Sequence, residues 1–336
     1  MEAVSTAGEI LADDVWIAVD DVSAVATARR RAAALAATAG LGTERIGEVE
    51  IVASELATNL VKHGGGGDLV LRRLSDGGLQ LLAVDSGPGT RNLEALVGDG
   101  VSTAGTLGVG LGAVRRLSTR LALWSQPAHG AVVAADVAAT SEPSRVGHLT
   151  RTLHGESVCG DTIAVRAVPG GWLLLVADGL GHGPLAAEAS RRAAEVLSDG
   201  RAVAPGEVVA RMHAALTGTR GAAVAVTRVD LAARTATHAG VGNISGRVVD
   251  GSGRSRALIS QPGIVGHRLP RVREAVVPLD DARLVVLHSD GLTEKWNGAD
   301  LPDVDRHGPS VCAAQLVRDA GTRRDDASVL ALRVTP

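Results

Sequence analysis

One stretch in the middle of the chain, residues 172–197, restricts the possible fold more than any other. It reads WLLLVADGLGHGPLAAEASRRAAEVL, so that an apolar segment leads to Asp178, three glycines and a proline follow, and an alanine-rich run completes it. This order predicts a buried strand, a tight turn and a helix. A carboxylate at the end of a buried strand is costly unless a cation meets it. The alternative is that Asp178 only caps the helix that follows.

Other acidic residues stand at similar places further along the chain. Asp161 begins an apolar segment, Asp290 follows the segment RLVVLHS, and Asp325 and Asp326 precede the last apolar segment. Each acid alone could be a turn or cap residue. A group of carboxylates repels itself and needs cations to be tolerated. Two divalent ions with oxygen ligands satisfy that need, which favours Mg²⁺ or Mn²⁺ over zinc.

Length and composition exclude several classes of protein. The 336 residues favour two domains, and the net charge of −3 gives no reason to expect nucleic acid or an anionic membrane as partner. The absence of Phe and Tyr also argues against binding by base stacking. No apolar run is long enough to span a bilayer, and the acidic start lacks the basic residues of a signal peptide. With only two cysteines, we expect a reduced, cytoplasmic setting.

The first half of the chain predicts two helices and two pairs of strands. We expect helices over 22–39 and 43–63, a strand hairpin over 69–84, and two further strands over 121–125 and 131–137. In the second helix Glu55, Asn59 and His63 are four residues apart and share one face. An acid and an amide on one face can orient a hydroxyl and complete a Mg²⁺ shell. The alternative for this triplet is a solvated polar face.

Two glycine-containing segments add to this half. Asp85 begins the segment DSGPG directly after a predicted buried strand, where a carboxylate can accept from an amine and glycines let a ligand approach the backbone. An ordinary turn would give the same pattern. The segment GTLGVGLGAVRRL over 105–117 is glycine-rich and leads into a helix, a place where free backbone N–H groups can meet phosphate. No strand directly precedes these glycines, which excludes a Rossmann dinucleotide site.

Taken together and in order, the three motifs resemble the ATP-binding GHKL fold of histidine kinases, gyrase and Hsp90, in its short anti-sigma-factor kinase form. The RsbT-like switch kinase, with its glycine box GxGxGLxxxRRL followed by a strand, is the most similar form, over residues 20–137. The resemblance implies that Asn59 binds Mg²⁺ beside ATP, that Glu55 orients or deprotonates the attacking hydroxyl, and that Asp85 holds the adenine amine. It also implies that five glycines shape the nucleotide site: Gly87, Gly89, Gly108, Gly110 and Gly112.

The second half of the chain resembles another family. The motifs VCGDTIAV, VADGLGHG, HSDGLTE and RRDDASVLAL, over residues 148–334, are similar to those of PP2C-type protein phosphatases in their bacterial SpoIIE-like form, and the glycine turn is most similar to the RsbX-like branch. The resemblance implies that Asp161 and Asp178 bind a pair of Mn²⁺ or Mg²⁺ ions. Gly179 would add its carbonyl, and Asp290 with Asp325 would complete the site. Asp326 stands where many relatives have Asn, so either of the two last acids is a candidate ligand.

Together the halves predict a two-domain α/β protein, with a GHKL ATPase sandwich over 1–138, a linker over 139–147 and a PP2C-like α-β-β-α sandwich over 148–336. The resemblance implies a bifunctional partner-switching regulator. One half would phosphorylate Ser or Thr on a STAS-domain protein, and the other would remove phosphate from such a protein. A sigma factor or another switch protein is a further candidate partner. The alternative is a phosphatase whose first half is only a nucleotide-gated binding module.

Overall fold

The computed structural model describes residues 8–11, 13–75, 77–91, 107–140, 143–269 and 271–335, apart from the side chains of residues 107–109. The chain forms two compact units. The larger unit consists of residues 1–13, 145–305 and 319–336, and the smaller unit of residues 14–144 and 306–318. Neither unit is one continuous segment of the chain, because the first residues belong to the larger unit and residues 306–318 belong to the smaller one.

The larger unit contains two antiparallel sheets. One sheet has the strand order β1-β8-β9-β10-β11-β14 and the other the order β13-β12-β15-β16-β7. Side chains from the central strands of both sheets form one apolar core, which places the sheets face to face. The strands are β1 (Glu9–Ile10), β7 (Val146–Arg151), β8 (Asp161–Val168), β9 (Gly171–Gly179), β10 (Ala222–Asp230), β11 (Thr235–Val241), β12 (Ser245–Asp250), β13 (Ser255–Leu258), β14 (Ala275–Pro278), β15 (Ala282–His288) and β16 (Ala327–Arg333).

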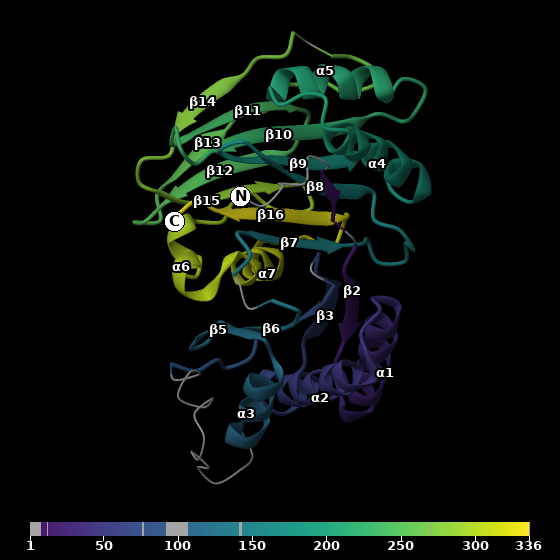
Figure 1. Ribbon diagram of the computed structural model, residues 1–336, viewed down its shortest axis with the longest axis vertical. Coiled ribbons are helices and arrows are strands. Elements are labelled where there is room, and N and C mark those ends of the chain that lie inside the picture. Colours follow the sequence, from purple (N-terminus) through teal and green to yellow (C-terminus); the bar gives the residue numbers. More distant parts are fainter. Residues whose placement is uncertain are drawn as a thin grey trace. The chain divides into compact units, whose positions relative to one another are not determined.

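Two helices cover the outer face of the six-stranded sheet. They are α4 (Pro184–Ser198) and α5 (Pro205–Ala215), and Figure 1 shows both against β8–β11. Their buried residues, such as Ala193 and Met212, pack with Leu173 and Leu175 of β9 in a second core. Strand β9 is therefore covered on both faces, which explains its continuous apolar sequence.

The smaller unit has one five-stranded antiparallel sheet covered on one face by three helices. The sheet order is β2-β3-β4-β6-β5, and one apolar core joins it to the helices. Figure 1 shows α1, α2 and α3 on the same side of this sheet. The elements are β2 (Val15–Ala18), α1 (Val22–Thr38), α2 (Thr43–Asn59), β3 (Asp68–Arg73), β4 (Leu79–Asp85), α3 (Leu107–Leu117), β5 (Arg120–Gln126) and β6 (Gly130–Val137). Residues 306–318, which belong to this unit, include the end of helix α6 (Val304–His307) and most of helix α7 (Pro309–Ala320).

The expected fold class, a mixed α/β protein with two parts, is confirmed. One expected helix ends early: α2 stops at Asn59, and a π-helical turn, η1 (Leu60–Gly64), follows it. The last residues of the expected helix over 43–63 therefore form a π-helical turn, which has more residues than an α-helical turn. Among the described residues no helix combines the length and the apolar character needed to cross a membrane.

Candidate metal and nucleotide sites

Two of the acidic residues face each other across neighbouring strands. Asp161 at the start of β8 pairs in register with Asp178 near the end of β9. The Asp161 side chain is buried, with 3% of its surface exposed, and its Oδ2 atom has no hydrogen-bond partner among the described residues. Asp178 is half-buried. A buried carboxylate oxygen without a donor is costly, and here a second carboxylate stands beside it.

The environment favours the neutral form of both acids. Burial raises the pKa of Asp178, and the charges of Asp161, Asp290, Asp325 and Asp326 raise it further. Burial also raises the pKa of Asp161, with repulsion from Asp326 and Asp290, while a hydrogen bond from Ser289 opposes the rise. All the acids that the sequence singled out in this half are therefore close enough to interact electrostatically.

Asp290 and Asp325 lie at the exposed side of this cluster. Loss of hydration raises the pKa of Asp290, and the Asp325 charge adds to the effect. The side-chain amide of Asn243 donates to Asp290 Oδ2 at 2.5 Å. Sequence reasoning missed Asn243, because the segment GVGN reads only as a turn between strands.

Asp326 is buried and held by backbone amides. Leu153 N donates to its Oδ1 at 2.7 Å, and Gly160 N donates to its Oδ2 at 2.8 Å. A Cβ atom on Gly160 would lie 2.9 Å from Asp326 Oδ2, and one on Gly291 would lie 1.9 Å from the Asp326 carbonyl oxygen. Both glycines, each adjacent to another acid of the cluster, thus make room for Asp326.

The turn after Asp178 has the expected order of strand, glycines and helix. Helix α4 begins at Pro184 after Gly183, and no side chain caps it. The alternative that Asp178 caps this helix is therefore wrong. A Cβ atom on Gly179 would lie 2.0 Å from the Ala186 carbonyl oxygen, so only glycine allows α4 to pack this close to the end of β9.

The residues of the cluster suit a hard divalent cation. Their oxygens are the donor type that Mg²⁺ and Mn²⁺ prefer, and the orphan oxygen of Asp161 offers a ligand that no protein group satisfies. Within the described residues no three acidic, His or Cys side chains yet converge on one point as a ligand shell. The cluster therefore fits a cation chemically, but its side chains need to move to close around one.

The smaller unit brings together the residues expected at a nucleotide site. Glu55 and Asn59 lie one turn apart on α2, and a Cβ atom on Gly110 of α3 would lie 2.5 Å from Glu55 Oε2 and 3.8 Å from Asn59 Oδ1. The amide nitrogen of Asn59 is buried without a partner among the described residues. The glycines Gly108, Gly110 and Gly112 all lie in α3, so they form the first turns of the helix and not a loop before it.

Asp85 ends β4 beside the π-helical turn. Its Oδ1 accepts from Gly87 N at 2.9 Å and from Ala131 N at 3.2 Å. Burial raises the pKa of Asp85, and these two amides and the Arg318 charge partly offset the rise. The carboxylate is thus half-buried with one oxygen held by the backbone.

Glycines allow the backbone to pack tightly around Asp85. A Cβ atom on Gly64 would lie 2.8 Å from Asp85 Cβ, one on Gly87 would lie 2.6 Å from the Gly64 carbonyl oxygen, and one on Gly89 would lie 2.1 Å from the Gln126 carbonyl oxygen. Sequence reasoning missed Gly64, because it read the four glycines at 64–67 only as a helix stop.

A second contact that the sequence did not predict comes from α7. The Arg318 guanidinium donates to the Asp85 carbonyl oxygen at 3.1 Å and lies over the Trp124 ring, 5.1 Å from its centroid. In the chain, α7 lies between Asp290 and Asp325. The segment that separates two acids of one cluster therefore also touches the residue expected to bind adenine.

Family models match both halves of the chain. The model described as "Histidine kinase-like ATPase domain" matches residues 18–135, and the model described as "Stage II sporulation protein E (SpoIIE)" matches residues 169–335. The chain is 32% identical over 114 residues to the serine/threonine-protein kinase RsbT of Bacillus subtilis, covering 86% of that protein and 33% of this chain. The chain belongs to the partner-switching regulators with a histidine kinase-like ATPase domain and a SpoIIE-type phosphatase domain.

Further relatives match the phosphatase half of this two-domain regulator. It is 25% identical over 153 residues to the phosphoserine phosphatase RsbX of Bacillus subtilis, which covers 73% of that protein and 46% of this chain. A solved structure from work on the bacterial stressosome is similar with 31% identity and a TM-score of 0.50, over 56% of this chain and 98% of that one. A structure of RsbX in complex with magnesium has 21% identity and a TM-score of 0.49, over 55% of this chain and 92% of that one. The match to the SpoIIE model and the similarity to RsbX show that the regulator carries a PP2C-type serine/threonine phosphatase domain.

Proposed function

We propose that this protein is a bifunctional regulator that removes phosphate from Ser or Thr of a STAS-domain protein and phosphorylates such a protein with ATP. The observation that carries the proposal is the pairing of Asp161 with Asp178 across β8 and β9, with an orphan carboxylate oxygen between further acids. Such a group is fully ionised at neutral pH only when a cation shares it. The similarity to RsbX and RsbT supports the two activities, since those relatives are named as a phosphatase and a kinase.

In the phosphatase half, we assign Asp161, Asp178, Asp290 and Asp325 as the carboxylates that hold two Mn²⁺ or Mg²⁺ ions, with the Gly179 carbonyl as a further ligand. When bound, such a pair supplies an activated water and neutralises the charge of the phosphoryl oxygens. Asp326 is less suited as a ligand, because both its oxygens already accept from backbone amides. We assign it the role of fixing the loops that carry Asp161 and Asp290.

The remaining residues of this half hold the ligands in place. Asn243 donates to one oxygen of Asp290 and leaves the other available. Ser289 hydrogen-bonds to Asp161, which favours the ionised form that a cation requires. In the exposed turn after Asp178, His182 Nδ1 and Glu156 Oε1 are 2.6 Å apart, and this pair fixes the turn next to the acidic cluster.

In the kinase half, we assign Asn59 to Mg²⁺, Asp85 to the adenine amine, and Glu55 to the hydroxyl of the protein substrate. The side-chain oxygen of Asn59 is the atom that can ligate Mg²⁺, and its buried amide nitrogen, which has no partner among the described residues, can donate to a phosphoryl oxygen. Glu55 lies beside the first turns of α3, where free backbone N–H groups can meet phosphate. Glu55 on the same helix face can accept the proton of a substrate hydroxyl while the nucleotide is held next to it.

The phosphatase proposal is tested with a phosphoserine-containing STAS protein and the full chain. Release of phosphate should require Mn²⁺ or Mg²⁺, should stop with a chelator, and should fall at least about 100-fold in Asp178→Asn. Asp281→Asn is the matched control, since Asp281 is an exposed acid of the same unit. Equal activity in Asp178→Asn and in the control would exclude the assigned site.

The kinase proposal is tested separately with labelled ATP and the unphosphorylated partner. We expect label on Ser or Thr of the partner with the wild-type chain and none with Glu55→Gln, while both proteins bind a non-hydrolysable ATP analogue. If neither protein transfers label although both bind the analogue, the first half is only a nucleotide-gated binding module. That outcome leaves the phosphatase proposal untouched.

A further inference from the structure

The turn that follows Asp178 is held in place from both sides. Leu180 N donates to the Gly221 carbonyl oxygen at 3.0 Å, which ties the start of the turn to the residue before β10. At the end of the turn, a Cβ atom on Gly183 would lie 3.0 Å from Glu156 Oε2, so the backbone packs closely against that side chain. The side chains on this turn are therefore presented on a fixed backbone, which lowers the entropy lost when a partner binds them.

Two leucines at this turn and at the start of α4 face solvent. Leu180 has 44% of its surface exposed and Leu185 has 53%, and no other leucine of the described residues is exposed to this degree. Single exposed apolar side chains are common, so the leucines alone do not define a site. Their position directly after an acid of the cluster makes them a candidate contact for an apolar group that approaches that cluster.

Arg220 adds a positive charge beside the same turn. It stands in the connection between α5 and β10, whose end is fixed because Ala222 N donates to the Val265 carbonyl oxygen at 3.0 Å. The Arg220 side chain is exposed, and among the described residues its guanidinium has no hydrogen-bond or ion-pair partner. A Cβ atom on Gly181 would lie 3.0 Å from Arg220 Nη1. The guanidinium therefore lies against the turn and keeps its donors free.

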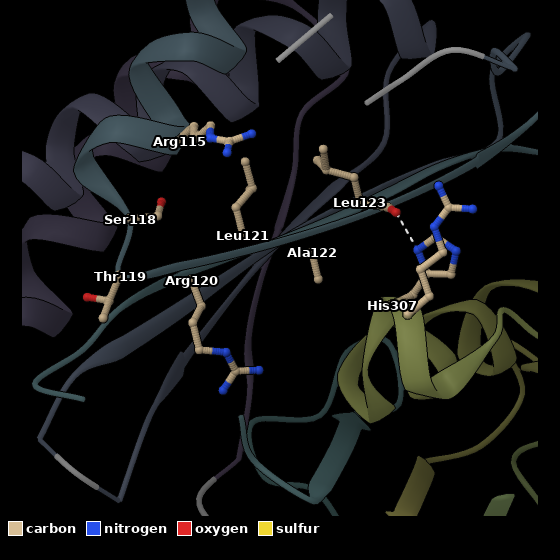
Figure 2. A pocket seen from close by; sticks show the side chains of 9 residues that line it. Arg115, Ser118, Thr119, Arg120, Leu121, Ala122, Leu123 and His307 are labelled. Carbon is tan, nitrogen blue, oxygen red and sulfur yellow. Dashed lines mark hydrogen bonds between the residues drawn. The ribbon is translucent and has the colours of Figure 1, made fainter. Parts of the chain in front are cut away.

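Two basic residues that line a pocket beside β5 differ from Arg220 in this respect. Figure 2 shows this pocket of the smaller unit. There, Arg120 pairs with Asp136 at 3.7 Å, and His307 Nδ1 is 2.6 Å from the Leu123 carbonyl oxygen. A basic group whose charge or donor is already engaged attracts an added anion less than a free one does, so Arg220 is the better candidate for binding an anionic group.

Gly181 separates the Arg220 guanidinium from the acidic cluster. A Cβ atom on Gly160 would lie 3.6 Å from the Gly181 carbonyl oxygen and 2.9 Å from Asp326 Oδ2. Arg220 stands two residues before β10, and the first residues of β10 pair with the end of β9, where Asp178 lies. The arginine is thus at the same end of the sheet as the acids. Its free charge can meet an anionic group of a molecule that is bound across the cluster.

We propose that Leu180, Leu185 and Arg220 form a docking surface for the segment of the substrate protein that flanks its phosphorylated residue. The surface fits a segment with an apolar and an acidic side chain, because the leucines can pack with the first and the guanidinium can donate to the second. Asp178 and Leu180 are two residues apart, about 7 Å along an extended chain. A bound extended segment covers that distance in two residues, so its apolar and acidic side chains stand two or three positions from the phosphorylated one. This inference rests on the proposed phosphatase function, which assigns the phosphate to the acidic cluster.

The test is calorimetry on the full chain with Mn²⁺ and a peptide that cannot be hydrolysed. The peptide carries a phosphonate in place of the phosphate ester of phosphoserine, with Leu and Asp two and three positions from it on both sides. A second peptide has Ser and Asn in place of Leu and Asp. We expect the wild type to bind the first peptide at least about tenfold more tightly than the second.

Variants assign this difference to individual side chains. In Arg220→Gln, exchanging only Asp for Asn in the peptide should change the affinity less than about twofold, and in Leu180→Ser the same should hold for exchanging only Leu for Ser. Arg191→Gln is the matched control, because Arg191 is an exposed arginine of α4 that also lacks a partner among the described residues. It should change the affinity for either peptide less than about twofold.

Several results would overturn the docking surface. They are equal affinities of the wild type for the two peptides, no binding of the first peptide, and an equal loss of affinity in Arg191→Gln and Arg220→Gln. A wild type that sediments as a dimer and a Leu180→Ser variant that sediments as a monomer would assign the leucines to a second copy of the chain, which also overturns it. Failure of the proposed function is a different result, because the wild type would then not hydrolyse p-nitrophenyl phosphate with Mn²⁺, whatever its preference between the peptides.

Discussion

Replacing Asp161 by Asn separates the needs of folding from those of metal binding. The Asp161 carboxylate is buried opposite Asp178, and its Oδ2 atom has no donor among the described residues. The amide of Asn keeps one acceptor oxygen and turns the other position into a donor beside the charges of Asp326 and Asp290. Without metal, Asp161→Asn should therefore be more stable than the wild type.

The size of the effect follows from the burial. Replacing a charge buried among like charges by a neutral group of the same shape gives a gain of about 1–3 kcal/mol in the free energy of unfolding. For a unit of this size that corresponds to a rise of about 2–10 °C in Tm. The size of the gain in stability depends on pH, because burial raises the pKa of Asp161 in the folded state. The folded wild type therefore loses stability as pH rises from the unfolded pKa to the folded one, and the gain in the variant is largest above that window.

Thermal unfolding followed by circular dichroism measures this effect, with chelator and with excess Mn²⁺ at pH 8. Mn²⁺ should stabilise the wild type strongly and Asp161→Asn little, because a ligand that binds only the folded state raises its stability. Asp281→Asn, an exposed acid, should behave as the wild type in both conditions. A lower Tm of Asp161→Asn in chelator, or an undiminished response to Mn²⁺, would refute the reasoning.

Three further predictions concern other parts of the chain. Gly110→Ala places a methyl group 2.5 Å from Glu55 Oε2, so the Glu55 carboxylate has to shift by about 1 Å. This shift should lower the rate of phosphate transfer from labelled ATP on the order of 100-fold, while unfolding curves should show little loss of stability. Arg318→Ala removes the hydrogen bond to the Asp85 carbonyl oxygen and should weaken binding of an ATP analogue by about 1 kcal/mol in calorimetry, whereas unchanged affinity would exclude a role in the nucleotide site. Burial lowers the pKa of His238 from 6.5 to about 4, so the unfolded state takes up a proton before the folded state does. The contribution of His238 to the free energy of unfolding should fall by about 3 kcal/mol as pH decreases from 6.5 to 4, opposite in sign to that of Asp161, and the difference between the wild type and His238→Gln in denaturant titrations measures it.

Local patterns in the sequence were sufficient to predict those elements whose structure is determined by neighbouring residues. The apolar run before Asp178, the glycines and Pro184 predict strand, turn and helix, and β9 and α4 have that order. The spacing of Glu55 and Asn59 likewise places them on one helix face. Regular periodicity is enough in both cases, because the contacts that fix these elements lie within a few residues.

Features that depend on distant contacts could not be predicted in this way. The π-helical turn at 60–64 replaces the last α-helical turn of the expected helix, and nothing in the composition marks it. Helix α7 has an amphipathic sequence, but such a sequence does not reveal which unit the helix joins. The contacts of Arg318 with Asp85 and of Asn243 with Asp290 depend on that tertiary arrangement.

The central claim is that one chain adds and removes phosphate on the same protein. The most direct measurement is the amount of label on a STAS-domain partner after incubation with labelled ATP, Mg²⁺ and Mn²⁺, for the wild type, Asp178→Asn and Glu55→Gln. The account predicts that label accumulates with Asp178→Asn, stays lower with the wild type and is absent with Glu55→Gln. Equal labelling by the wild type and Asp178→Asn, or full labelling by Glu55→Gln, would contradict it.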